Sequence, residues 1–332
     1  AFRASMLEGV EEEGLFVREE LTTKISTLGK LCLILIVLVP VGCIFIDVAN
    51  LAVLPIIFGA AVLAIWLVWW RKCRNDLAFD LVIKMFTLGF YPGCFLVMII
   101  QLVLGFLFVV ACFGSEVGAL MDKLKEAKKG ASDLDTLLPD PSFRVFLFLF
   151  LLSYVMAAFT EETMKYCFPN QSRRVRSTHT PHAFIVAAGC VAIGFSTLEN
   201  VGYICLGSVP LQTRLTTTLG RVTIALPLHT ICGLFVGLRT TIRCTVERQR
   251  GFLWVLLPSV FIHGTFDFVQ LALQYSFVKL AVDPTIVEPV SNTVAVVMML
   301  LGGVAFGRSY KRHPPEQMIH DLEMERLASS PL

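Results

Sequence analysis

Four successive apolar segments carry side chains of the types that perform acid–base chemistry. These are Glu161, Glu162 and Lys165 in the first segment, Glu199 and Asn200 in the second, Arg221 and His229 in the third, and His263 and Asp267 in the fourth. A charge at the centre of a bilayer costs about 2.5–3.5 kcal/mol, so such groups are uncommon without a partner or a task. Their recurrence in four neighbouring segments indicates one functional site.

Helical spacing places these side chains on defined faces. Glu161 and Lys165 are four residues apart, and so are His263 and Asp267, so each pair shares one face of a helix. We expect the polar faces to turn toward one another around a water-containing pocket, where mutual hydrogen bonds relieve the cost of burial.

Two residues next to the histidines favour a cavity. Pro227 weakens the backbone ladder just before His229, and Gly264 lets another helix approach His263 closely. The sequence therefore predicts irregular, closely packed helices around the pocket.

Each polar group also has a purely structural interpretation. Glu161 and Glu162 could lie at a helix end with Lys165 as a surface partner. Asp267 could form a pair with His263 that only joins two helices. We expect Asn200 and Arg221 to orient their neighbours and not to act as catalysts.

The elements that must position these residues are membrane spans. Hydrophobic residues make up 55% of the chain and charged residues only 16%, against about a quarter in soluble domains. A span needs about 20 mainly apolar residues. Eight segments qualify, at 27–46, 50–70, 90–113, 143–167, 183–206, 216–238, 251–275 and 288–307. The sequence predicts an all-α, polytopic transmembrane bundle of about eight spans, with the active site among spans four to seven.

Charge in the connections predicts the topology. Basic residues cluster after spans two, four, six and eight, which places these loops and both termini in the cytoplasm. The expected organisation is a polar N-terminal tail (1–26), three spans and a polar loop (27–142), a catalytic four-helix core (143–275), a last span (276–307) and a polar C-terminal tail (308–332).

The composition also indicates the partners. The lipid bilayer is the first, and the formal net charge of +2, without a phosphate-binding loop, argues against nucleic acid. The ten cysteines include no CxxC pair and are expected to be buried hydrophobic residues, with acylation of Cys167 as an alternative. No feature indicates an oligomeric state.

The order of the motifs resembles a known family. Glu161-Glu162-x-x-Lys165, Phe195-x-x-x-Glu199-Asn200, the stretch from Arg221 to His229 and His263-x-x-x-Asp267 are together similar to the PrsW-type intramembrane proteases, over residues 143–275. These are grouped with CAAX prenyl endopeptidases and bacteriocin-processing enzymes, although the CAAX type usually has histidine where this chain has Glu199.

The resemblance implies an integral membrane endopeptidase that hydrolyses peptide bonds of membrane-protein substrates, as the bacterial namesake does with a membrane-anchored anti-sigma factor. Carried over by position, Glu161, Glu162, Glu199 and His263 match the catalytic motifs. His229 and Asp267 match supporting polar positions.

Amide hydrolysis needs an activated water, oxyanion stabilisation and a proton donor for the leaving amine. We expect Glu161 or Glu162 to hold and deprotonate the water, with help from Glu199. His229 and His263 are the candidates for oxyanion stabilisation and proton donation.

A zinc-dependent route is an alternative, in which His229, His263 and Glu199 would supply three ligands and leave a position for water. The HExxH signature is absent. Two other functional classes also fit buried acids and histidines: a proton- or cation-coupled transporter or membrane receptor, and an inactive, protease-like scaffold.

The predicted topology contains one conflict. Glu161 falls toward the cytoplasmic side of span four, whereas Glu199 falls toward the opposite side of span five. A single pocket therefore requires tilted helices, or spans that begin about one turn, or 5.4 Å, deeper.

Overall fold

The computed structural model describes residues 25–70, 73–74, 77–114, 116–118, 139–171, 181–206, 210–247, 249–280 and 283–318. All regular secondary structure in these ranges is helical, and eight helical stretches are long and apolar enough to cross a membrane. The predicted fold class is confirmed. The N-terminal tail up to residue 24, most of the 114–142 loop, the arginines after span four and the chain beyond 318 lie outside the described residues.

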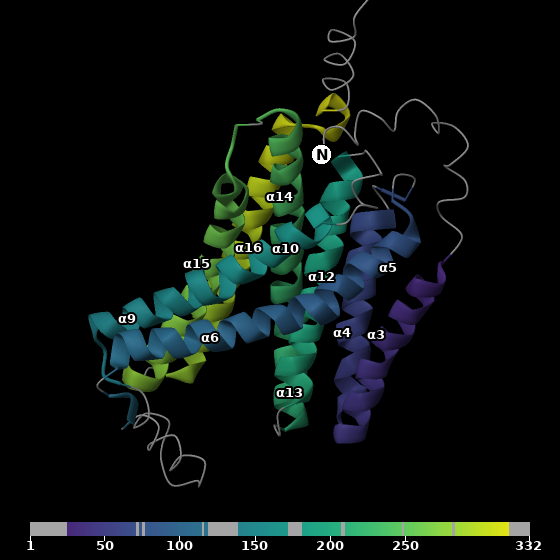
Figure 1. The fold of residues 1–332 in the computed structure, drawn as a ribbon. Coiled ribbons are helices and arrows are strands. Elements are labelled where there is room, and N and C mark those ends of the chain that lie inside the picture. The colour runs from purple at the N-terminus through teal and green to yellow at the C-terminus, as the bar shows by residue number, and fades with distance from the viewer. Residues whose placement is uncertain are drawn as a thin grey trace, which may run out of the picture.

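Figure 1 shows the arrangement of the helices. Several spans contain a short π-helical segment, here named η. In chain order they are α3 (Thr27–Ile46); α4 and η1 (Asn50–Ile65, Trp66–Trp70); α5, η2 and α6 (Phe79–Leu88, Gly89–Gly93, Cys94–Phe113); α9, η3 and α10 (Phe143–Phe150, Leu151–Phe159, Thr160–Gln171); α12 (Pro181–Cys205); α13, η4 and α14 (Leu211–Gly220, Arg221–Ala225, Leu226–Thr245); α15 (Phe252–Leu280); and α16 (Pro284–Arg312).

The third span begins at Phe79 and not at residue 90 as predicted. Asp80 and Lys84 reduce the hydropathy of its first turns, and in the structure they form an ion pair with each other. The backbone N–H and the hydroxyl of Ser26 also donate to Asp80, at 3.0 and 2.8 Å, which ties the start of α3 to α5. Two charged residues that pair with each other can therefore lie inside a span, and a prediction from hydropathy alone then makes that span too short.

The helix α12 lies at the centre of the bundle and is almost wholly buried. Glycines allow its neighbours to approach closely. A Cβ atom on Gly194 would lie 2.0 Å from the carbonyl oxygen of Phe86 in α5, and one on Gly233 in α14 would lie 2.5 Å from the Cβ of Ala192. Small residues thus set the spacing of the helices around the polar residues of α12.

Two helical stretches run across the others in Figure 1: α6, and the stretch from α9 to α10. The remaining long helices stand upright or lean in the same view. This oblique crossing decides how far span four carries its glutamates across the bundle.

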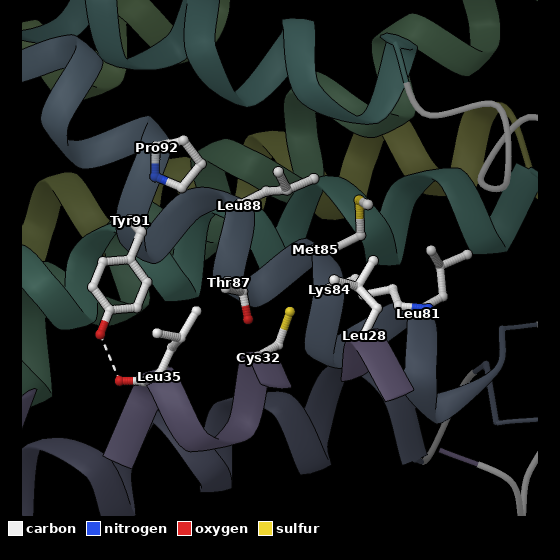
Figure 2. A pocket seen from close by; sticks show the side chains of 10 residues that line it. All are labelled: Leu28, Cys32, Leu35, Leu81, Lys84, Met85, Thr87, Leu88, Tyr91 and Pro92. Carbon is white, nitrogen blue, oxygen red and sulfur yellow. Dashed lines mark hydrogen bonds between the residues drawn. The ribbon is translucent and has the colours of Figure 1, made fainter. Parts of the chain in front are cut away.

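An apolar cavity of about 530 Å³ separates α3 from α5 and η2. Figure 2 shows Leu28 and Cys32 of α3 facing Leu81 and Leu88 across it. The hydroxyl of Tyr91 donates to the carbonyl oxygen of Leu35 at 2.5 Å. None of the acid–base residues of spans four to seven lines this cavity.

Candidate active site

Two π-helical segments lie directly beside the predicted site residues. The segment η3 ends at Phe159, immediately before Glu161 and Glu162, and η4 begins at Arg221 and ends just before Pro227. π-Helical turns in membrane and soluble proteins often mark functional sites, because they shift the register of the residues that follow. The irregularity expected before His229 is therefore present as a π turn followed by a proline in the first turn of α14.

Glu161 is the centre of the cluster and is 4% exposed. Its Oε1 accepts a hydrogen bond from Nε2 of Gln101 at 3.1 Å. Its Oε2 lies 3.6 Å from Nδ1 of His229 and 3.8 Å from Nε2 of His263, and has no hydrogen-bond partner. The two imidazole rings stand nearly perpendicular, at 76°, with centroids 4.8 Å apart. One carboxylate oxygen thus faces two imidazole nitrogens.

The other nitrogen of each imidazole lies against a different carboxylate. Nδ1 of His263 is 2.9 Å from Oε1 of Glu162, and Nε2 of His229 is 3.3 Å from Oε2 of Glu199. A carboxylate on the outer nitrogen fixes the tautomer and the orientation of a histidine. Both rings are therefore held with the inner nitrogen toward Glu161.

Lys165 is fully buried, which makes its interpretation as a surface partner wrong. Its Nζ donates to Oε1 of Glu162 at 2.5 Å and lies 3.1 Å from Nδ1 of His229. The lysine thus pairs with the second glutamate of the motif, three residues away, instead of with Glu161.

Arg221 contacts two other predicted site residues. Its Nη2 donates to Oε2 of Glu199 at 2.7 Å, and its Nε donates to Oδ1 of Asn200 at 2.5 Å. The guanidinium also lies 4.1 Å above the ring of Tyr203. Glu199 is therefore held between an arginine and a histidine.

The cluster is open at one edge. Oδ2 of Asp267 lies 3.3 Å from Nε2 of His263, and its side chain is 25% exposed. The side chain of Glu199 is 20% exposed, whereas those of Glu161, Glu162 and His263 are at most 5% exposed. The cluster is therefore partly exposed at the side where Asp267 and Glu199 lie.

The structure resolves the conflict in depth between Glu161 and Glu199, because both carboxylates contact the ring of His229. Span four crosses the upright helices obliquely (Figure 1), and Glu161 and Glu199 contact the same imidazole ring. All nine predicted site residues are joined through direct contacts: Glu161, Glu162, Lys165, Glu199, Asn200, Arg221, His229, His263 and Asp267.

The family model for "PrsW family intramembrane metalloprotease" matches residues 78–302, more than half of the chain. The chain belongs to this family. The match extends beyond the resemblance over 143–275 to include spans three and eight.

Among curated proteins, the protease PrsW of Geobacillus kaustophilus (strain HTA426) is 30% identical over 95 residues, which are 28% of this chain and 39% of that protein. The aligned part is thus well under half of the length of that relative. No solved structure matches the chain.

The donor atoms of this PrsW family member are arranged to fit a metal ion. Glu161, His229 and His263 each offer one ligand atom, all within 4.8 Å of one another. A cation in this triangle would give the unpaired Oε2 of Glu161 a partner. The inner nitrogens of the two histidines already have neighbours: Lys165 lies 3.1 Å from Nδ1 of His229, and Asp267 lies 3.3 Å from Nε2 of His263. The glutamate of this set is Glu161, whereas the sequence indicated Glu199. In the structure Glu199 contacts the outer nitrogen of His229 and is bound by Arg221.

Gln101 is a site residue that the sequence reasoning missed. It lies in α6, in a span to which no chemistry was assigned, and it holds Oε1 of Glu161. Its only signal was a single amide among apolar residues. Tyr154 was also missed. Its ring packs against Gly264, where a Cβ atom would lie 2.5 Å from it, and this is the close helix approach expected beside His263.

Proposed function

We propose that this chain is an intramembrane endopeptidase that hydrolyses peptide bonds of membrane-associated proteins at the cluster around Glu161. The observation that carries the proposal is the unpaired, buried Oε2 of Glu161, which faces two imidazoles whose outer nitrogens lie on Glu162 and Glu199. A transport relay needs a chain of donors and acceptors through the protein, whereas this arrangement converges on one point.

Charge supports a divalent cation at that point. The cluster contains four carboxylates, on Glu161, Glu162, Glu199 and Asp267, and the permanent cations that contact them within the described residues are Lys165 and Arg221. With neutral histidines and ionised acids, two negative charges remain in a buried site, which is costly. A divalent cation held by Glu161, His229 and His263 would offset them.

Zinc suits this set of two imidazoles and one carboxylate, because catalytic zinc takes three protein ligands and keeps one position for water. When bound, the metal would activate that water and polarise the scissile carbonyl. The remaining residues have positional roles: Glu162 and Glu199 orient the two histidines, and Arg221 holds Glu199 in place.

Asp267 is the group best placed to move protons. It lies at the exposed edge, next to His263, where the substrate and water enter. Its carboxylate would take a proton from the attacking water and return it to the leaving amine. In the metal-free alternative Glu161 itself deprotonates the water.

We also infer the orientation of the chain. The loop between α14 and α15 is basic, which favours the cytoplasmic side for this end of the bundle. With eight spans, both ends of the given chain would lie on that side as well. The catalytic core would comprise residues 143–275 together with Gln101 of the third span.

The test is cleavage of a panel of single-span membrane proteins by the purified chain in lipid vesicles. Glu161→Gln and His263→Ala should abolish cleavage, whereas the lipid-facing Leu301→Ala, at a side chain 55% exposed, should leave it unchanged. Loss of cleavage with a chelator and recovery with zinc would support the metal route. Cleavage that persists with chelator would support the metal-free route.

A folded parent protein that cuts no member of the panel would overturn the proposal. So would a Glu161→Gln variant that cuts as fast as the parent, because the carboxylate at the centre of the cluster would then have no part in the reaction.

A further inference from the structure

A groove of about 780 Å³ lies between α13–η4 on one side and α15 and α16 on the other. Figure 1 shows α13 and the neighbouring ends of α15 and α16 diverging, at the end of the bundle opposite the α14–α15 loop. Its walls combine apolar side chains, such as Phe277 and Val287, with hydroxyl, amide and guanidinium groups on Thr217, Arg221, Gln270, Gln274, Ser291 and Asn292. None of these except Arg221 belongs to the proposed active site.

The groove leads to the active site along two helices. On α15, His263, Asp267, Gln270 and Gln274 follow one another at spacings of three and four residues, so they lie on one face. On the opposite wall, Arg221 lines the groove and donates to Glu199. The groove therefore reaches Arg221, which contacts Glu199 at the exposed edge of the cluster.

The polar residues of the walls extend from the helix ends into the apolar segments. Arg221 is ten residues from the start of α13 and Gln270 is ten residues from the end of α15. At 1.5 Å per residue both lie about 15 Å along the helix from its end, and five residues inside the apolar segments 216–238 and 251–275. Amide and guanidinium groups at this depth need partners in place of lipid.

Some of these groups are available to a ligand. Gln274 and Asn292 are exposed, and their side chains make no hydrogen bond with another described residue. Gln270 and Ser291, in contrast, are hydrogen-bonded to each other through their side chains, and Nε2 of Gln270 also donates to the carbonyl oxygen of Ser291 at 2.9 Å. One part of the wall is thus fixed, and another presents free amides to the groove.

We propose that this groove admits the substrate polypeptide in an extended form, from the side opposite the basic loops, and delivers it to Asp267 and Glu199. This inference rests on the proposed protease function. An extended backbone within the membrane must pair its N–H and C=O groups, and neutral amides and hydroxyls can pair with them whatever the substrate sequence. A lipid chain would instead favour apolar walls such as those of the cavity in Figure 2.

Photocrosslinking tests the path. A benzophenone-bearing amino acid replaces Asn292 or Gln274, or Leu28 in the apolar cavity as the control, each in a Glu161→Gln background that leaves the substrate uncut. The probe is the tagged member of the single-span panel that the parent protein cleaves best. Crosslinks from Asn292 and Gln274, and none from Leu28, support the groove as the path.

A kinetic measurement distinguishes substrate from water as the occupant. Asn292→Leu should raise KM for the same probe about tenfold and change kcat less than twofold, because it removes binding that is equal in ground and transition states. A lower kcat with unchanged KM and no crosslink at Asn292 or Gln274 would overturn the inference and leave the groove as a water path.

The two proposals fail in different ways. If the parent protein cleaves no member of the panel, the protease function fails, and the inference fails with it. If the parent cleaves its probe but crosslinks form only at Leu28, the function stands and the groove is not the path.

Discussion

Breaking the buried ion pair in α10 should destabilise the protein more than breaking any surface pair. Lys165 and Glu162 are both 0% exposed, and their charged atoms are 2.5 Å apart. Removing one partner of a buried pair costs about 3–5 kcal/mol, because it leaves a buried charge without compensation. We therefore expect Lys165→Met to lower the free energy of unfolding by about 3–5 kcal/mol.

The double variant separates pairing from packing. In Glu162→Leu/Lys165→Met no charge of the pair remains, so its loss of stability should be smaller than the sum of the two single losses by about 2–3 kcal/mol. The unfolding free energy can be measured in lipid bicelles by steric trapping. Because His263 also bonds to Glu162, this variant should be inactive even when it is folded.

Arg144→Ala is the matched control. Arg144 lies 3.7 Å from Glu116, and the two side chains are 65% and 58% exposed. Exposed pairs contribute about 0–1 kcal/mol, so this variant should stay close to the parent protein. A Lys165→Met protein that is also within about 1 kcal/mol of the parent would refute the reasoning that the pair is buried and mutually compensating.

Two further predictions concern packing and pH. Gly264→Ala forces a methyl group against the ring of Tyr154 and should cost about 1–3 kcal/mol in thermal unfolding, whereas Gly202→Ala, which meets nothing within 4 Å, should cost nothing. A penalty for both would contradict the close approach. The backbone N–H of Ala49 donates to the carboxylate of Asp47, and Arg214 forms an ion pair with it. Both contacts hold the pKa of Asp47 below its usual range. The ionised Asp47 therefore stabilises the fold above pH about 4, and this stabilisation is lost as the pH falls further. The melting temperature of Asp47→Asn should consequently decline less between pH 5 and pH 2 than that of the parent protein. An equal decline in both proteins would contradict the prediction.

The polar cluster could be predicted from the sequence because the bilayer makes it conspicuous. A glutamate or histidine within an apolar span is costly, so Glu161, Glu199 and His263 could be selected by type alone. The helical spacing of these residues predicted which face of each helix is polar, and in the structure these polar faces meet.

The arrangement inside the cluster could not be predicted in the same way. The three residues that could hold a metal include Glu161 because span four crosses the bundle obliquely. The angle at which two helices cross does not affect the residue spacing within one helix, so it could not be predicted from that spacing. Gln101 was missed because a neutral amide costs less to bury than a charge and has no periodic partner in its span. The early start of the third span was hidden by Asp80 and Lys84, whose charges neutralise each other only in the folded protein.

The central position of α12 has a consequence for how the protein is made. The first three spans are its most hydropathic stretches and expose most of their surface, so each can partition into lipid on leaving the ribosome-bound translocon. The helix α12 is less hydropathic, carries Glu199 and Asn200, and has almost no surface that faces outward in the finished bundle. Its stable position in the membrane therefore depends on packing against α5 and α14. Because α14 follows α12 in the chain, we expect α12 to become stable only once this later span has also been integrated.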